Sequence, residues 1–161
     1  MTATARPESE QAEAGVESGP VLLDTNVLVY ATNRDSPFYD RAQQVLQQAL
    51  AGEPAACLTP QILAEYYAVV TDPRRVESPL TPRQARAQIE ALLQALEVLP
   101  LRASSSRQMA ELAERYRIRA QEVYDVQVVA AMLDHGISTI LTANERDFRR
   151  FAEIEVRNPF A

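Results

Sequence analysis

Three acidic residues stand out in the sequence because apolar residues surround each of them. Asp24 directly follows the apolar run 21–23, Glu65 lies within the largely apolar segment 61–70, and Asp125 opens another apolar run. Carboxylates gathered at one place repel one another unless their pKa values rise or a divalent cation neutralises them. Carboxylate oxygens suit Mg²⁺ or Mn²⁺, and such an ion polarises a phosphate group and lowers the pKa of an attacking water. The chemistry that these residues indicate is metal-assisted hydrolysis of a phosphodiester bond.

Polar residues also follow a later apolar run, residues 137–141. Thr142 comes first, and Asn144 and Asp147 stand shortly after it. In a parallel α/β sheet the functional crevice lies beyond the carboxyl ends of the strands. If both apolar runs are strands of one such sheet, these polar side chains share an edge with Asp24.

Each of the acids also has an ordinary structural explanation. Asp24 is well placed to begin the turn or helix that follows its strand, and Asp147 is equally well placed to cap a short last helix. Glu65 shares a helix face with Ile62 and Tyr66, but a glutamate at the edge of such a face extends its carboxylate into solvent. The functional interpretation therefore depends on the acids as a set rather than on any one of them.

Apolar runs and helical periodicities alternate along the chain. A capping hydroxyl followed by proline predicts three helix starts, at Ser36-Pro37, Thr59-Pro60 and Thr81-Pro82. We expect strands at residues 21–23, 55–58, 98–101, 137–141 and 155–157, and helices at 37–51, 61–70, 82–96, 107–116 and 125–134, with a helical turn at 27–30 and a short last helix after 142. Strands that alternate with helices predict an α/β fold, a three-layer α/β/α sandwich with a central, mostly parallel sheet.

The chain of 161 residues is long enough for one domain with a sizeable core. Residues 1–20 are polar and low in complexity, so we expect a disordered leader there and one folded domain at residues 21–161. The net charge of −6 does not indicate nucleic-acid binding, although a metal ion and a few local arginines would suffice for it. Candidates for contact with a nucleic-acid backbone, each equally explained as an ordinary surface arginine, are Arg34, Arg74, Arg75 and Arg146.

Other catalytic groups are excluded by the scarcity of suitable residues. The only histidine, His135, stands beside Gly136 at a predicted helix end, and the only cysteine, Cys57, lies in an apolar run where we expect a buried thiol. They form no evident Ser–His–Asp or Cys–His set, and they disfavour zinc. Four glycines provide no phosphate-binding loop. Because the sequence has no disulfide framework, no signal-peptide pattern and no run of roughly 20 apolar residues, we expect a cytoplasmic protein that does not enter a membrane.

Four segments share their order and spacing with a known family. They are Leu23-Asp24-Thr25-Asn26, the helical Glu65, residues 124–131 around Asp125, and residues 141–148. Over about residues 21–160 the sequence resembles the PIN-domain family, specifically the VapC-type toxin ribonucleases. The resemblance implies a PIN-like fold and a Mg²⁺- or Mn²⁺-dependent endoribonuclease that cleaves single-stranded RNA. It also implies a homodimer that is the toxin of a type II toxin–antitoxin pair, with the tail of a cognate antitoxin in its acidic pocket.

The resemblance assigns the family's first three acids to Asp24, Glu65 and Asp125. It implies that Asp24 and Asp125 ligate the metal, while Glu65 binds it through water or positions the nucleophile. The fourth acidic position departs from the family pattern, because Asn144 stands where many relatives have an acid and Asp147 follows three residues later. This departure bears on a second metal ion more than on the first. The remaining candidates, which would complete the catalytic set, orient the carboxylates or contact the substrate, are Thr25, Asn26, Thr142, Asn144 and Asp147.

Two other functions fit the same residues. A PIN nuclease of RNA maturation, outside any toxin system, would have the same site. A PIN-like module that has lost catalysis would serve as a binding partner, but the presence of Asp24, Glu65 and Asp125 argues against it. Under the nuclease interpretation, replacing Asp24 or Asp125 by Asn abolishes cleavage and leaves stability equal or higher, because repulsion between like charges is relieved.

Overall fold

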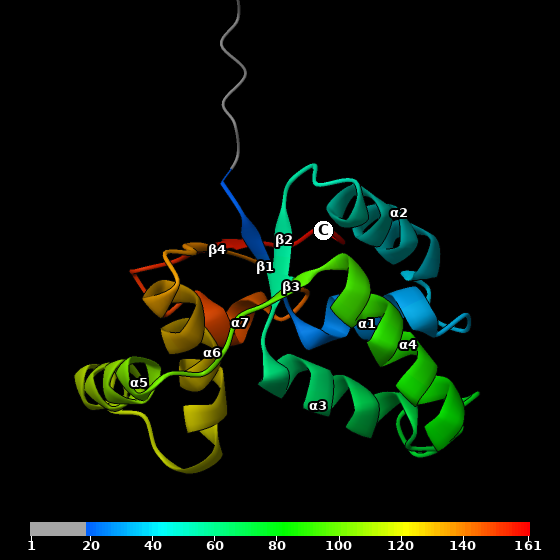
Figure 1. The fold of residues 1–161 in the computed structure, drawn as a ribbon. Helices are drawn as coiled ribbons and strands as arrows, with labels where there is room; N and C mark the ends of the chain where they lie inside the picture. Colours follow the sequence, from blue (N-terminus) through cyan, green and yellow to red (C-terminus); the bar gives the residue numbers. More distant parts are fainter. Residues whose placement is uncertain (1–18) are drawn as a thin grey trace, which may run out of the picture.

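The computed structural model describes residues 19–161, shown in colour in Figure 1. Most of the predicted leader falls on residues 1–18, which lie outside the described part. The described chain forms one sheet whose five strands are all parallel, in the order β3-β2-β1-β4-β5. The strands are β1 (Val21–Leu23), β2 (Ala56–Leu58), β3 (Glu97–Val98), β4 (Thr139–Leu141) and β5 (Glu155–Arg157). The prediction of an α/β fold with a parallel sheet is therefore confirmed.

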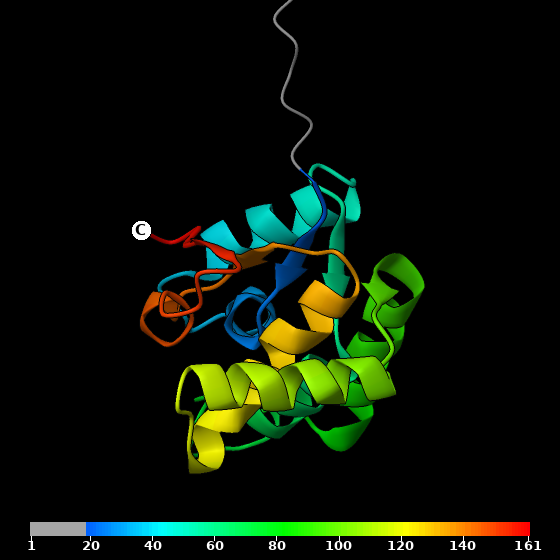
Figure 2. The same cartoon turned by 90° about the vertical axis from the view of Figure 1, so that its left-hand side faces the viewer.

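Helices flank this sheet on both sides. They are α1 (Thr25–Thr32), α2 (Tyr39–Leu50), α3 (Pro60–Val70), α4 (Pro82–Ala95), α5 (Ala103–Arg115), α6 (Val123–Asp134) and α7 (Glu145–Phe148), with a 3₁₀ turn, η1, at Ala120–Glu122. Figures 1 and 2 show α6 between α5 and the sheet on one side, whereas α2 and α4 lie on the other. None of the helices within residues 19–161 has the length and apolar character that a bilayer crossing requires.

Hydroxyl caps fix the starts of two central helices. Thr59 Oγ1 accepts a hydrogen bond from the backbone N–H of Ile62 at 3.2 Å, and α3 begins at the next residue, Pro60. Thr81 and Gln84 form a reciprocal capping box before α4, with hydrogen bonds of 2.9 and 3.2 Å. Both starts agree with the sequence prediction, because the cap and the proline act within a single turn.

Four predicted boundaries are wrong. Helix α2 begins at Tyr39 rather than at Pro37, because the Ser36 hydroxyl accepts from the N–H of Phe38 in a turn and does not cap the helix. Helix α1 extends for eight residues where a single turn was predicted. Helix α5 begins four residues before the predicted start, and the Ser105 hydroxyl accepts there from the N–H of Arg102 at 3.3 Å. The third strand is also displaced and shorter than residues 98–101, since β3 holds only Glu97–Val98.

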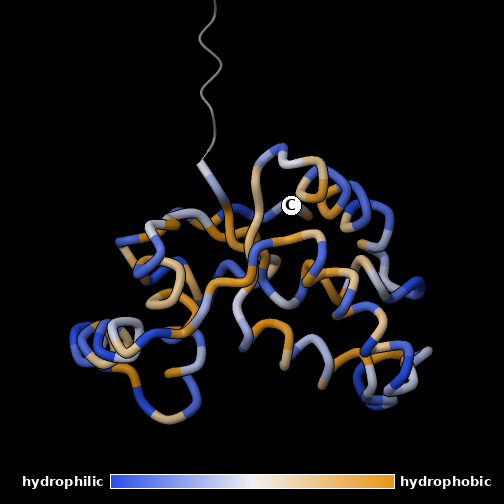
Figure 3. Tube along the Cα trace, viewed as in Figure 1, coloured by the Kyte–Doolittle hydropathy of each residue, from blue (hydrophilic) through white to orange (hydrophobic). Residues whose placement is uncertain are grey.

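The core lies around β1, the central strand. Its residues Val21, Leu22 and Leu23 are at most 1% exposed. Helix α6 adds buried residues to the same hydrophobic cluster, among them Val126, Val129 and Met132. Figure 3 shows apolar residues along these central segments and polar residues on α2 and α5. Cys57 on β2 is buried as predicted; its thiol donates to the carbonyl oxygen of Val21, and burial raises the pKa of the thiol to about 12.

Candidate active site

Asp24 is fixed at the carboxyl end of the central strand. It directly follows β1 and is the residue before α1, and its side chain is only 8% exposed. One carboxylate oxygen accepts from the backbone N–H of Thr25 at 2.7 Å. The other oxygen accepts from Asn26 Nδ2 at 2.8 Å and from Thr142 Oγ1 at 2.7 Å. Three donors therefore hold one carboxylate in a single orientation.

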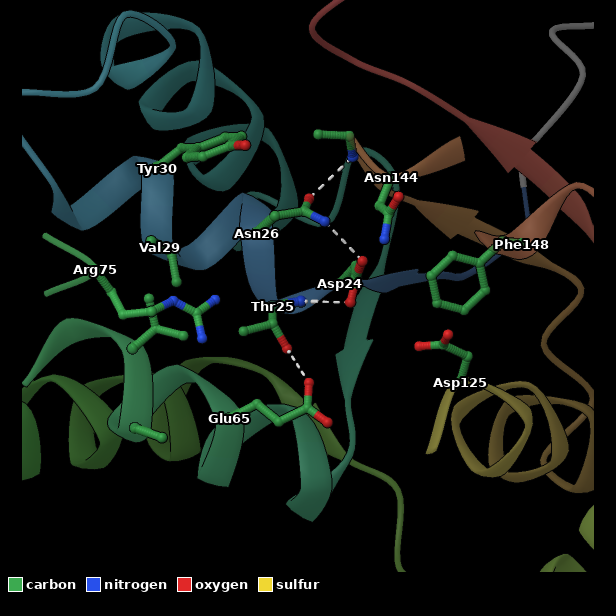
Figure 4. Close-up of a pocket in the computed structure, with 13 residues that line it drawn as sticks. Asp24, Thr25, Asn26, Val29, Tyr30, Glu65, Arg75, Asp125, Asn144 and Phe148 are labelled. Atoms are coloured by element: carbon green, nitrogen blue, oxygen red, sulfur yellow. Dashed lines mark hydrogen bonds between the residues drawn. The ribbon is translucent and has the colours of Figure 1, made fainter. Parts of the chain in front are cut away.

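Thr142 and Asn26 tie this carboxylate to the neighbouring strand end. Thr142 follows β4, is fully buried, and also accepts from Asn26 Nδ2 at 3.1 Å and from the N–H of Asn144 at 2.9 Å. The Asn26 side-chain oxygen accepts from the N–H of Ala143 at 2.9 Å. Figure 4 shows part of this network between α1 and the turn after β4. The strand-end rule thus places Asp24 beside Thr142, as predicted.

Asp125 faces Asp24 from the first turn of α6 (Figure 4). Burial, together with the negative charges of Asp147, Asp24 and Glu65, raises the pKa of Asp125 to about 6. The pKa of Asp24 is raised as well, mainly by burial, against the lowering effect of its hydrogen bonds. Two carboxylates that resist ionisation in the same place form a site that favours a cation.

Glu65 reaches the same pocket from α3. Its carboxylate accepts from Thr25 Oγ1 at 3.1 Å and from Gln61 Nε2 at 2.7 Å. Gln61 Nε2 also donates to the backbone oxygen of Tyr124 at 3.1 Å, so it joins α3 to the start of α6. Glu65 is exposed, although Ile62 and Tyr66 on the same predicted helix face are buried. It therefore lies at the solvent-accessible edge of that face.

The pocket between these groups has a volume of about 660 Å³. This is within the range of about 300–1,000 Å³ for small-molecule sites. Its walls come from Asp24 at the end of β1, from α1, α3, the loop after α3 and α6, and from the segment after β4 with α7. The lining residues are Asp24, Thr25, Asn26, Val29, Tyr30, Glu65, Ala68, Val69, Arg75, Asp125, Ala143, Asn144 and Phe148.

Two predicted site residues stand at the edge of this pocket. Asn144 lines it, and its side-chain amide donates to Asp147. Asp147 does not line the pocket, although its charge contributes to the raised pKa of Asp125. Asn144 lies directly before α7 but makes no side-chain cap hydrogen bond. The structure therefore brings Asp147 near the acids without placing it among them.

The acidic pocket fits a small, hard cation. Within residues 19–161, no three acidic, histidine or cysteine side chains form a complete ligand set. Asp24 and Asp125 supply two opposed carboxylates, and protein-bound Mg²⁺ commonly uses one or two carboxylates and keeps several waters. The pocket lining adds the carboxylate of Glu65, the hydroxyl of Thr25 and the side-chain amides of Asn26 and Asn144. This oxygen-rich set suits Mg²⁺ or Mn²⁺ better than a metal that prefers sulfur or imidazole.

Three residues in or beside the pocket were not identified, or only weakly, from the sequence. Gln61 and Tyr30 gave no signal, because their roles depend on contacts between distant elements. Arg75 was one of several candidate arginines, and only the structure places it in the pocket. His135 lies away from the pocket, at the end of α6, with Nε2 2.9 Å from the backbone oxygen of Pro100.

Comparisons of the sequence with known proteins identify its family. The PIN domain family matches residues 21–154 of the chain. Ribonuclease VapC48 of Mycobacterium tuberculosis is 35% identical over 149 residues, covering 86% of this chain and 97% of the relative. Ribonuclease VapC43 of the same species is 30% identical over 141 residues, covering 86% and 95%.

Solved structures share the fold at lower sequence identity. VapBC2 from Rickettsia felis, bound to a DNA fragment from its promoter, has a TM-score of 0.63 at 20% identity, covering 86% of this chain and 98% of that chain. VapC20 of Mycobacterium tuberculosis, a toxin that cleaves the sarcin-ricin loop, has a TM-score of 0.62 at 19% identity, covering 84% and 98%. The chain belongs to the PIN-domain family. Within that family it is a VapC-type ribonuclease.

Proposed function

We propose that this ribonuclease is a divalent-metal-dependent endoribonuclease that hydrolyses phosphodiester bonds of single-stranded RNA in the pocket around Asp24. The observation that carries this proposal is the pair of facing carboxylates, Asp24 and Asp125, whose pKa values are both raised. Folding places these two groups together at an energetic cost, since each would ionise more readily in water. A cation that removes this cost and binds a phosphate explains the arrangement.

Asp24 and Asp125 would hold Mg²⁺ or Mn²⁺. Such an ion polarises the scissile phosphate and lowers the pKa of the attacking water. Thr142, Asn26 and the backbone of Thr25 keep the Asp24 carboxylate in place before any ligand arrives. An aspartate held in one orientation loses no conformational freedom when the ion and the substrate bind, whereas a flexible aspartate would.

Glu65 would position the attacking water or accept its proton. Its carboxylate lines the pocket and is oriented by Thr25 and Gln61, so it could hold a water there. Asn144 and Asp147 would complete the rim, where their amide and carboxylate contact water or the RNA. Because Asn144 carries no charge, this rim supports one metal ion rather than two.

We also propose that this chain is the toxin of a toxin–antitoxin pair and that it forms a homodimer. Its partner would be a cognate antitoxin that covers the acidic pocket. Several structural relatives were crystallised as toxin–antitoxin complexes, including one from Klebsiella pneumoniae. A pocket with three acids attracts a cationic segment of a partner by the same charge that attracts a metal. Co-expression with the product of the adjacent gene tests this, and a stable complex that lacks nuclease activity is the expected result.

The nuclease proposal is tested by incubating the full chain with a panel of single-stranded RNAs in Mg²⁺, in Mn²⁺ and in EDTA. We expect cleavage in either metal, none in EDTA, and none by Asp24→Asn or Asp125→Asn, both shown by circular dichroism to be folded. Arg83→Ala, on the exposed surface of α4, is the matched control and retains activity. Folded wild-type protein, free of antitoxin, that cuts no RNA in either metal would refute the nuclease.

A further inference from the structure

Arg75 gives the acidic pocket a positively charged side. Of the described residues that line the pocket, only Arg75 is basic. Its neighbour Arg74 is engaged elsewhere, because Nε and a terminal nitrogen of its guanidinium donate to the two Asp72 oxygens at 3.0 Å each. Within residues 19–161 no ion pair involves Arg75. A guanidinium that forms no ion pair and lines the pocket is available for a phosphate.

Three aromatic rings form a cluster that begins at Tyr30, on the same side of the pocket as Arg75. Tyr30 lines the pocket from α1, with its ring centroid 5.1 Å from that of Phe38 and 5.3 Å from that of Phe160. The Phe38 and Phe160 centroids are also 5.3 Å apart. Phe38 is 37% exposed, so the cluster offers an uncovered ring surface.

Hydrogen bonds near the chain end hold Phe160 in this cluster. The Phe160 N–H donates to Asn158 Oδ1 at 2.9 Å, and Arg41 Nε on α2 donates to the backbone oxygen of Pro159 at 2.9 Å. Phe160 lies beyond residues 21–154, the part that the PIN domain family matches. The cluster is therefore built from α1, the turn before α2 and a segment outside the matched domain.

Arg75 and Tyr30 lie on the side of Asp24 that is opposite to Asp125 (Figure 4). The guanidinium of Arg75 points toward Thr25, and Tyr30 stands above it across Val29. An RNA strand whose scissile phosphate lies between Asp24 and Asp125 would leave the pocket in two directions, and one of them leads past Arg75 and Tyr30. On the side of Arg75 it meets a cation and then an aromatic surface, the two groups that a nucleotide needs.

We infer that Arg75 and the cluster Tyr30–Phe38–Phe160 form a binding subsite for one unpaired nucleotide next to the cleaved bond. Arg75 binds the phosphate that flanks the scissile one, and the base stacks on Tyr30 and Phe38. Aromatic rings stack with every base and arginine binds every phosphate, so the subsite selects single-stranded RNA with little preference for sequence. A base held in a duplex cannot reach the rings, which limits cleavage to loops and unpaired segments.

This inference rests on the proposed nuclease function, and its test separates the two. A short RNA that the wild-type chain cuts at one position is resynthesised with single abasic sites on either side of the cut. We expect one flanking abasic site to lower kcat/KM by roughly 5- to 150-fold, the range for loss of one base–aromatic stack. In Tyr30→Leu the intact RNA suffers the same loss, and the abasic site then has no further effect. Tyr30→Phe, which keeps the ring, restores the wild-type pattern.

A binding measurement gives a second readout that does not depend on catalysis. Fluorescence anisotropy of a labelled RNA is followed with Asp125→Asn as the uncleaving background. Adding Arg75→Ala weakens binding about tenfold or more, as loss of a charge-assisted contact does, and reduces the salt dependence of binding. Adding Arg74→Ala, the matched control on the same loop, leaves binding within about twofold because that guanidinium is paired with Asp72.

Three outcomes would overturn the subsite. One is wild-type cleavage with no position-specific abasic effect, and another is unchanged RNA binding in Arg75→Ala. The third is a loss of antitoxin inhibition in Tyr30→Leu while RNA cleavage stays at the wild-type rate, which would assign the surface to a peptide. If the wild-type chain cuts no RNA at all, the nuclease proposal fails first and the abasic series is not reached.

Discussion

Thr142 Oγ1 donates a 2.7 Å hydrogen bond to Asp24 Oδ2 although the two residues are 118 positions apart in the chain. The sheet register explains this contact. Leu23 pairs with Leu141 where β1 and β4 run in parallel, so the residues that directly follow these two strands emerge side by side. The orientation of the Asp24 carboxylate is therefore set by the pairing of the central strands.

Replacing Thr142 by Val removes this donor and the acceptor for Asn26 and Asn144. Because Thr142 is fully buried, we expect a stability loss of about 1–3 kcal/mol, the usual cost of unpaired buried polar groups. Cleavage falls as well, since Asp24 loses its fixed orientation. Urea unfolding and cleavage rates measure the two effects.

Thr139→Val is the control for this change. Thr139 lies on β4 and is almost fully buried, but among residues 19–161 its hydroxyl makes only a 3.5 Å contact with Glu155, which does not line the pocket. It should leave kcat/KM unchanged. Equal losses of cleavage in both variants would show that Thr142 acts through the stability of the strand and not through Asp24.

Replacing Asp125 by Asn abolishes cleavage and raises stability. Within residues 19–161 no hydrogen bond holds the Asp125 side chain, so neutralising it removes burial cost and repulsion and loses nothing. The gain is on the order of 1 kcal/mol, or roughly 2–4 °C in Tm, because the group is only partly buried. Thermal unfolding in EDTA measures it.

Asp24→Asn behaves differently in the same experiment. Neutralisation again relieves burial, but an amide nitrogen then faces the N–H of Thr25 or the donors of Asn26 and Thr142. The two effects oppose each other, so we expect little net change in Tm together with complete loss of cleavage. A larger gain at Asp24 than at Asp125 would contradict this account of the network.

The raised pKa of Asp125 also predicts a pH dependence of stability without metal. The folded state holds the proton up to about pH 6, whereas the unfolded chain releases it near the ordinary value of 3.8. The folded state thus binds more protons between these values, and the stabilisation present below about pH 4 is lost as the pH rises through 6. The difference in unfolding free energy between Asp125→Asn and wild type should grow across this window and level off above it. A constant difference from pH 4 to 7 would mean that Asp125 is not the titrating group.

Gln61 is expected to matter for activity more than for stability. Its amide nitrogen links Glu65 on α3 with the backbone of Tyr124 on α6, next to Asp125. Gln61→Ala frees the Glu65 carboxylate and should lower kcat by about tenfold, with a stability cost near 1 kcal/mol for the lost hydrogen bonds. Gln94→Ala, on the exposed surface of α4, is the control and changes neither. A rise in KM without a change in kcat would instead assign Gln61 to substrate binding.

Much of the fold was predictable because local signals determine it. The alternation of apolar runs with capped helices gave all five strands within about three residues, and the starts at Pro60 and Pro82 follow from a hydroxyl and a proline in adjacent positions. The places of Asp24 and Thr142 followed from the rule for parallel strand ends. The boundaries that were wrong depend on competing local turns, such as the one in which Ser36 accepts from Phe38.

The rest of the site depends on tertiary contacts that no local pattern encodes. The link made by Gln61 requires α3 and α6 to approach, and the ring cluster requires Phe160 to return to α1 from the far end of the chain. The exposure of Glu65 is likewise a tertiary feature, because it depends on the pocket beside α3. Only the folded chain decides which of the four candidate arginines lines the pocket, and that residue is Arg75.

The buried thiol of Cys57 has a practical consequence for anyone who studies this protein in solution. With its pKa at about 12 and its sulfur enclosed by β1 and β2, it does not compete for maleimide dyes or nitroxide labels at neutral pH. A cysteine introduced on the surface, for example at Gln94, would be the single reactive handle on the native chain. Distance and mobility measurements by fluorescence or electron paramagnetic resonance then need no cysteine-free background.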